Sequence, residues 1–215
     1  MTASAYGKAM NDSGTGLPPS GRSLRDRTAR LLSGALGSAI VMIVLVSAMW
    51  AIEVVDYVED GHLDRYGIVA HEPDGLAGIL FAPFLHAGFA HLMANSVPLL
   101  ILGFLAAIRG IGRFLAASLL IIVVSGLGVW FTSPPNTLTV GASGLVFGYF
   151  GYVVARGLFD RRALDILLGV VVAVLYYSIL WGALPSQPGI SWQGHLFGLI
   201  GGVLAAWLLR RRKPS

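Results

Sequence analysis

Two residues that could carry out hydrolysis stand in glycine-rich apolar stretches of the chain. Ser143 lies between small residues in TVGASGLVFGYFG (139–151), and His195 lies in GHLFGLIGG (194–202). A serine hydroxyl is a weak nucleophile until a base takes its proton, and a neutral imidazole can do so near neutral pH. This pairing predicts Ser143 as nucleophile and His195 as general base.

The residues around this pair could serve the same reaction. Attack on an amide creates an oxyanion, which needs preorganised donors. His91 and Asn95 in HLMAN are four residues apart and share one helix face, and the N–H of Ser143 adds a donor at the positive end of a helix dipole. Phe147, one turn after Ser143, could hold the imidazole by ring packing. His86 is off the face of His91, and we expect it at the mouth of the cavity.

The elements that must position these residues are membrane helices. The chain has 215 residues, of which 55% are hydrophobic and only 12% charged, which is typical of a bilayer protein rather than a soluble domain. Runs of about 20 apolar residues predict spans. Six are found, at 31–51, 84–108, 114–131, 143–158, 164–180 and 193–209.

The distribution of charge predicts the orientation and the domain organisation. Arginines follow spans two, four and six, whereas the loop 56–74 is mainly acidic, so the positive-inside rule places both termini in the cytoplasm. We expect a disordered basic cytoplasmic tail at 1–30, a membrane domain at 31–209 and a basic cytoplasmic C-terminus at 210–215. The net charge of +4 follows from this bias, which disfavours nucleic-acid binding.

Distances along the helices place the polar residues at one depth. At about 1.5 Å per residue, Ser143, Asn95 and His195 each lie on the order of 20 Å from the arginine that ends their span. In a hydrocarbon core of about 30 Å, that level is on the order of 10 Å below the outer surface. Span four is the shortest, so its first turn is expected to start inside the membrane, beside a wet pocket that opens outward.

Small residues recur along spans four and six at helical spacing, which is typical of helices that touch. Such contact would let the short Ser143 side chain approach His195. No acidic residue lies in spans two, four or six, so the expected catalytic unit is a dyad without a carboxylate. The small residues are Gly144, Gly148, Gly151, Gly194, Gly198 and Gly202.

These motifs resemble the rhomboid family of intramembrane serine proteases. The sequence GASG (141–144) opens a span, HLMAN (91–95) lies on span two and GHLFGLIGG on span six, and the resemblance covers about 79–209. It implies an all-α, polytopic bundle of six transmembrane helices with a short fourth helix that starts inside the membrane. It also implies Ser143 and His195 as the catalytic dyad, and His91, Asn95 and the Ser143 N–H as the oxyanion site. Gly141, Gly144, Phe147 and Gly198 are then supporting residues.

The family resemblance also sets expectations for substrate and location. It implies cleavage of single-span membrane proteins near the outer face, with membrane lipid around the enzyme and no metal or nucleotide cofactor. We expect an integral membrane protein, in the plasma membrane of a prokaryote, and the sequence sets no expectation for its oligomeric state.

Two departures from the family pattern concern the outer loop and the ring below the serine. Many members carry a Trp-Arg pair in the first outer loop, whereas 56–78 contains no tryptophan. Where many members have a tyrosine below the serine, this chain has Phe147, which keeps the ring face and loses the hydroxyl.

Three alternatives remain at this level. A catalytically silent relative would bind client helices, although such proteins usually lack the serine or the histidine. A haem or metal site could use His86, His91 and His195, although it would leave Ser143 without a role. A transporter with a helix broken at 139–143 would need a coupling charge at mid-membrane, which the sequence lacks.

Substrate access is expected between spans two and five, with Pro98 within span two.

Overall fold

A computed structural model describes residues 22–185 and 189–210 of the chain. The polypeptide divides into two units, Met1–Ser33 and Gly34–Ser215, and α1 (Arg22–Val58) begins in the first and continues in the second. Residues 22–30 are therefore helical, which corrects the predicted disorder there, because the helix simply continues beyond the apolar run. The rest of the predicted tail, 1–21, and the C-terminal residues 211–215 lie outside the described residues.

Five further long helices lie where the apolar runs of the sequence predicted spans. They are α3 (Phe89–Ala107), α4 (Ile111–Thr132), α5 (Ser143–Asp160), α6 (Ala163–Tyr176) and α7 (Trp192–Leu208). The predicted start of span two at 84 is five residues early, because the chain turns at Gly88, which has a φ of +108° and directly precedes α3. The last four residues of span five also differ from the prediction, because α6 ends at Tyr176 and the chain continues as the 3₁₀ helix η4 (Tyr177–Ala183).

Four helical segments of the described residues are long and apolar enough to cross a membrane: Thr28–Val58, Phe89–Ala107, Ile111–Thr132 and Ala163–Ala183. The protein is therefore an integral membrane protein with a helical bundle. Helix α5 is not one of these segments. It carries two charged residues, Arg156 and Asp160, and other helices surround it. Because little of its surface can contact lipid, the helix does not need to be apolar throughout.

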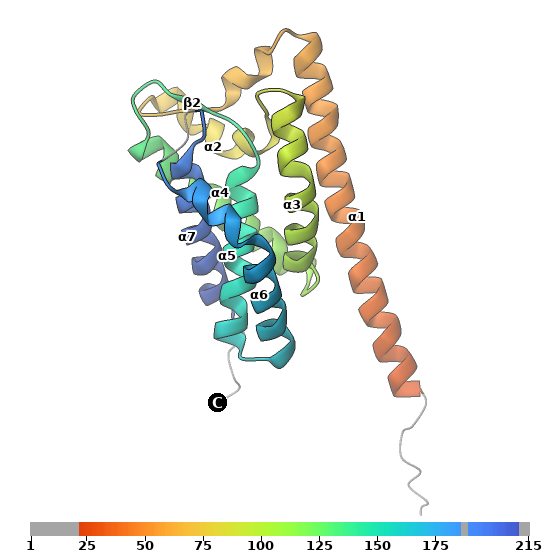
Figure 1. Ribbon diagram of the computed structural model, residues 1–215. Coiled ribbons are helices and arrows are strands. Elements are labelled where there is room, and N and C mark those ends of the chain that lie inside the picture. The colour runs from red at the N-terminus through yellow and green to blue at the C-terminus, as the bar shows by residue number, and fades with distance from the viewer. Residues whose placement is uncertain (1–21, 186–188, 211–215) are drawn as a thin grey trace, which may run out of the picture. The chain divides into compact units, whose positions relative to one another are not determined.

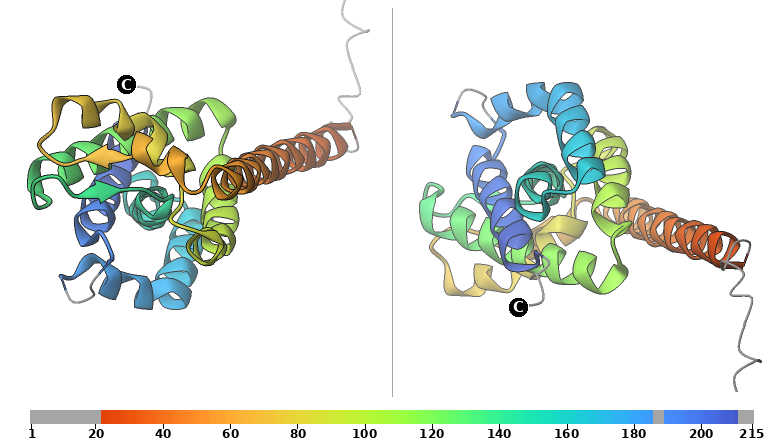
Figure 2. Two further views of the ribbon diagram at one scale, coloured as in Figure 1. Left: turned by 90° about the horizontal axis from the view of Figure 1, so that it is seen from above. Right: turned by 90° about the horizontal axis from the view of Figure 1, so that it is seen from below.

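Helix α5 is the centre of the bundle. It contacts α3, α4, α6 and α7, and the view along the helices shows it enclosed by its neighbours (Figure 2). Tyr149 and Tyr152 are completely or almost completely buried in it, and the Tyr149 hydroxyl shares a hydrogen bond of 2.7 Å with the Ser118 hydroxyl on α4. Because α5 begins at Ser143, the first turn of the most buried helix carries the predicted nucleophile.

The contact between α5 and α7 is made backbone to backbone, as the glycine spacing predicts. A Cβ atom on Gly198 or Gly202 of α7 would overlap the carbonyl oxygen of Gly144 or Gly148 on α5. Helix α4 closes on the same seam, since the Ser125 hydroxyl donates to the Gly194 carbonyl at 2.9 Å. Three helices therefore meet next to Ser143 and His195.

The segment between α1 and α3 folds against the chain that precedes α5. It contains η1 (His62–Tyr66), β1 (Ile68–Val69), η2 (Pro73–Leu76), α2 (Gly78–Phe81) and η3 (Ala82–Phe84). Strand β1 pairs antiparallel with β2 (Leu138–Thr139), with Ile68 opposite Thr139, and this short ribbon is visible at one end of the bundle (Figure 1). In the described residues, the fold is thus helical with a ribbon of two strands of two residues each, which the all-α prediction did not include.

Charged side chains join α5, α6 and the turn after α3 at the other end of α5. Arg109, which follows α3, forms an ion pair of 2.7 Å with Asp165 on α6, and Arg156 of α5 lies 3.4 Å from the same carboxylate oxygen. In the sequence, these arginines indicate only the orientation of the helices. Asp165, which is 1% exposed, was not recognised as their partner.

Candidate active site

The turn before α5 holds Ser143 in place. Gly141 has a φ of +122°, which only glycine adopts without strain, and its N–H donates to the Ala82 carbonyl at 2.8 Å. The next N–H, that of Ala142, donates to Nε2 of His86 at 3.3 Å. In the described part of the chain, the N–H of Ser143 has no hydrogen-bond acceptor, as expected for the first turn of a helix.

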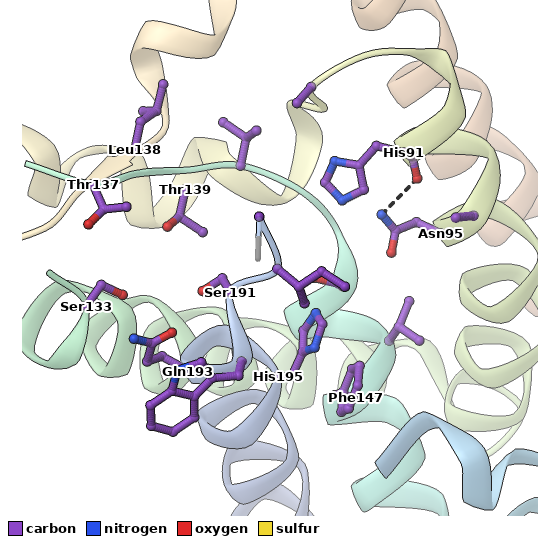
Figure 3. A pocket seen from close by; sticks show the side chains of 18 of the residues that line it. His91, Asn95, Ser133, Thr137, Leu138, Thr139, Phe147, Ser191, Gln193 and His195 are labelled. Atoms are coloured by element: carbon purple, nitrogen blue, oxygen red, sulfur yellow. Dashed lines mark hydrogen bonds between the residues drawn. The ribbon is translucent and has the colours of Figure 1, made fainter. Parts of the chain in front are cut away.

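A cavity of about 770 Å³ opens at this turn (Figure 3). Five residues that the sequence singled out line it: Ser143, His195, His91, Asn95 and Phe147. They come from α3, α5 and α7, so three helices that are separate in sequence contribute to one wall. The other side chains that line the cavity are mainly apolar.

His195 is held from two directions. Its ring stacks on that of Phe147, with centroids 4.1 Å apart and planes 10° from parallel, which is the ring contact expected from the sequence. Its Nδ1 lies 2.8 Å from the Gly182 carbonyl oxygen. A carbonyl oxygen can only accept, so Nδ1 carries the proton and Nε2 is the nitrogen left to act as a base.

Ser143 and His195 share the cavity without a direct hydrogen bond. No bond between their side chains occurs among the described residues, although both line the same wall. Catalytic hydrogen bonds are often long in a free enzyme and shorten when substrate binds. The free protein therefore has the two residues in one site. We expect their side chains to come within hydrogen-bonding distance when substrate binds.

His91 and Asn95 lie on one face of α3, as predicted, and both line the cavity (Figure 3). The Asn95 side-chain amide donates one N–H to the His91 carbonyl at 3.1 Å, which leaves its second N–H available. The His91 ring packs against the turn before α5: a Cβ on Gly141 would lie 2.6 Å from Cε1 of His91. Position 141 therefore requires glycine for two reasons: its φ is positive, and a side chain there would overlap the His91 ring.

The prediction for His86 is wrong. The residue is 1% exposed and does not line the cavity mouth. Its ring lies edge-on to that of His91, with centroids 5.1 Å apart, and Nε2 accepts the Ala142 N–H. The turn at Gly88 explains the difference, because it separates His86 from the helix whose face the prediction assumed.

Attachment of the loop between α1 and α3 was not predicted from the sequence. Beyond the β1–β2 pair, the indole N–H of Trp130 donates to the Glu72 carbonyl at 2.9 Å, and the His71 ring donates through Nε2 to the Ser133 carbonyl at 2.9 Å. These bonds fix the loop to the end of α4 and to the segment that leads to Ser143. A lone tryptophan and a lone histidine far apart in sequence give no signal for such a contact.

Two further observations concern another serine of the cavity and the binding of a metal ion. Ser191 also lines it, but its hydroxyl accepts the Gly194 N–H at 3.2 Å and so caps α7. Within residues 22–185 and 189–210, no group of three His, Asp or Glu side chains is placed to hold a metal ion.

The fold and the site define a polytopic membrane protein in which packed helices enclose a cavity with a serine and an oriented histidine. The sequence profile of the rhomboid domain matches residues 73–212. The chain belongs to the rhomboid family, which indicates a rhomboid-type intramembrane protease at the level of the family.

Several curated proteins are similar to this chain. An uncharacterized protein of Mycobacterium tuberculosis (strain H37Rv) is 43% identical over 176 residues, which cover 78% of this chain and 73% of that protein. An uncharacterized protein of Mycobacterium leprae is 38% identical over 190 residues, covering 85% and 75%. YdcA of Bacillus subtilis, which is named as a proposed rhomboid protease, is 33% identical over 135 residues, covering 60% of this chain and 65% of that protein.

Proposed function

We propose that the protein is a serine endopeptidase that cleaves transmembrane segments of single-span membrane proteins near the outer face of the membrane. Ser143 is the nucleophile and His195 the general base and acid. The observation that carries this proposal is the His195 ring itself, which Phe147 and the Gly182 carbonyl hold with Nε2 free, in the cavity that Ser143 lines.

The reaction follows from these positions. Ser143 Oγ attacks the scissile carbonyl carbon while its proton passes to His195 Nε2. The resulting oxyanion accepts hydrogen bonds from the Ser143 N–H, the free N–H of Asn95 and the His91 ring. Nε2 then gives its proton to the leaving amine as the C–N bond breaks, and water, activated by the same imidazole, hydrolyses the acyl-enzyme.

The Gly182 carbonyl supplies part of what a carboxylate does in a triad. It accepts the Nδ1–H bond that fixes the tautomer, as an acidic residue would, but it carries no negative charge to stabilise the imidazolium. The Phe147 ring face compensates in part, because an aromatic ring attracts a cation above its plane. A dyad of this kind fits a site without an acidic side chain.

In the proposed topology the chain crosses the membrane six times, with α5 and α7 as the fourth and sixth spans. At about 1.5 Å per residue, the 18 residues of α5 extend over about 27 Å, less than a hydrocarbon core of about 30 Å. Its first turn, with Ser143, then lies within the membrane beside the cavity. Both termini are cytoplasmic, and the bacterial relatives support a plasma membrane location in a prokaryote.

The substrate must lose helical structure before it is cut. An α-helix is about 10–12 Å wide and hides its amides in hydrogen bonds, so a cleavable segment must unwind locally, most easily near Gly or Pro. The mainly apolar lining of the cavity supports binding of such an extended segment. Access between α3 and the α6–η4 segment remains the route that we propose.

Cleavage in defined liposomes tests the function. Purified protein is reconstituted with a panel of single-span reporters that carry Gly or Pro in the outer part of the span, and the products are mapped by mass spectrometry. We expect cleavage that both Ser143→Ala and His195→Ala abolish, while Ser191→Ala retains it. A protein that binds reporters but cleaves none, with or without Ser143, would instead be the catalytically silent relative.

A further inference from the structure

The role of Gly182 is not predicted by any motif of the sequence. It lies in η4, an element in which no residue is fully buried and in which Tyr177 and Trp181 are mostly exposed. Yet its carbonyl makes the hydrogen bond to Nδ1 of His195, the predicted general base. An otherwise loosely packed segment thus makes a specific polar contact with the site.

The fit around Gly182 is tight for a side chain. A Cβ atom there would lie 3.0 Å from Cζ of Phe147 and 3.1 Å from Nδ1 of His195, both tighter than ordinary van der Waals contact. The absence of a side chain lets the backbone reach both rings of the stacked pair. Close approach, and not an unusual φ, is the reason for glycine at this position.

We propose that Gly182 is a positioning residue for catalysis, whose carbonyl oxygen sets the tautomer and orientation of His195 in place of a side-chain carboxylate. This inference rests on the proposed function. It adds that the chain that follows α6 orients the general base together with the Phe147 ring of α5. If the bond is lost, the neutral ring can adopt the tautomer with its proton on Nε2, which cannot accept the proton of Ser143.

A backbone substitution tests this carbonyl without changing any side chain. Replacement of Ala183 by lactic acid turns the Gly182 carbonyl into an ester, which is a weaker acceptor. The matched control replaces Trp181 by the α-hydroxy acid with the same side chain. This change also removes one N–H from η4, but it weakens the Leu180 carbonyl and leaves that of Gly182 an amide. Both proteins are compared with the natural chain for cleavage and for thermal unfolding.

We expect the Ala183 ester to lower kcat by about 2-fold to 10-fold with KM unchanged, the range that corresponds to one net hydrogen bond. In ¹⁵N-histidine NMR spectra, with His195 assigned by its loss in His195→Gln, the Nδ1–H proton should move upfield in this protein. The Trp181 ester should keep both kcat and the Nδ1–H signal. A purely structural role for η4 would lower thermal stability in both esters alike and leave the signal in place.

Equal kcat values and equal Nδ1–H signals in the two esters would overturn the role of Gly182. A separate experiment distinguishes this failure from failure of the proposed function. Fluorophosphonate labelling that persists in Ser143→Ala would refute the dyad itself. Labelling that depends on Ser143, together with equal kcat values and equal Nδ1–H signals in the two esters, would refute the positioning role alone.

Discussion

The ring of Phe147 lies flat against the imidazole of His195, with 4.1 Å between centroids and 10° between planes. One ring comes from the second turn of α5 and the other from the first turn of α7, so their stacking depends on the close approach of these two helices. The hydroxyl of the tyrosine that many rhomboid proteases have at this position is not needed for the stack. The face of the ring makes the contact.

The first prediction concerns this stack. Phe147→Tyr keeps the ring face and should leave kcat within about 2-fold, whereas Phe147→Ala removes the support of the imidazole and should lower kcat by about 2-fold to 10-fold, or more if a cavity forms beside the base. Steady-state cleavage of a reporter in liposomes measures both. Equal activity of the alanine and tyrosine variants would show that His195 does not depend on Phe147.

Asn95 allows a test of the oxyanion site. Asn95→Ala should lower kcat with little change in KM, because its free N–H would act on charge that develops only in the transition state. The loss is at most roughly 100-fold to 1,000-fold, and less where His91 and the Ser143 N–H compensate. Thermal unfolding of the variant controls for loss of its bond to the His91 carbonyl. A rise in KM alone would assign Asn95 to substrate binding.

Packing of α7 on α5 predicts a contrast between two glycines. A methyl group on Gly198 would overlap the Gly144 carbonyl, so Gly198→Ala should lower the free energy of unfolding by about 1–3 kcal/mol and reduce activity as well. Gly112 in α4 has nothing within 4 Å of an added Cβ, so Gly112→Ala should be neutral or slightly stabilising. Unfolding in mixed micelles compares them, and equal stability of the two variants would contradict direct backbone contact.

The outer loop should respond to pH through Asp64. Burial, with a smaller contribution from the charge of Asp56, raises the pKa of Asp64 from 3.8 to about 6. Between these values the folded protein holds a proton that the unfolded chain releases, so stability falls as pH rises through this interval and changes no further above it. Asp64→Asn should therefore raise the thermal midpoint relative to the natural chain near pH 7.5 and lessen the difference near pH 4.5.

The control for this prediction is Asp74→Asn, which changes an exposed carboxylate of the same loop. It should leave the pH dependence of the midpoint as in the natural chain. If the midpoint of Asp64→Asn changes with pH as steeply as that of the natural chain, Asp64 is not the group responsible.

The sequence predicted the parts of the site that depend on helical periodicity. The spacing of His91 and Asn95, the stack of Phe147 on His195 and the glycine contact between α5 and α7 all follow from residues three, four or seven apart on regular helices. The structure places these residues as expected. Their catalytic roles remain predictions, since geometry alone does not test them.

The contacts that the sequence did not predict involve irregular backbone. Gly182 acts through its carbonyl, which any residue possesses, and its position depends on the change from α6 to η4 after Tyr176. His86 was assigned to the wrong place because the turn at Gly88 breaks the helical register that the prediction used. The β1–β2 pair joins two-residue strands some 70 positions apart, too short for any period to be recognised.

The central claim, that Ser143 is the nucleophile, can be tested by locating a covalent adduct. The purified protein in detergent is treated with a fluorophosphonate probe, digested and sequenced by mass spectrometry. We predict a single adduct on Ser143 that His195→Ala greatly reduces and that Ser191→Ala leaves unchanged. An adduct on Ser191 or Ser133, the other serines that line the cavity, or labelling that does not depend on His195, would contradict the account.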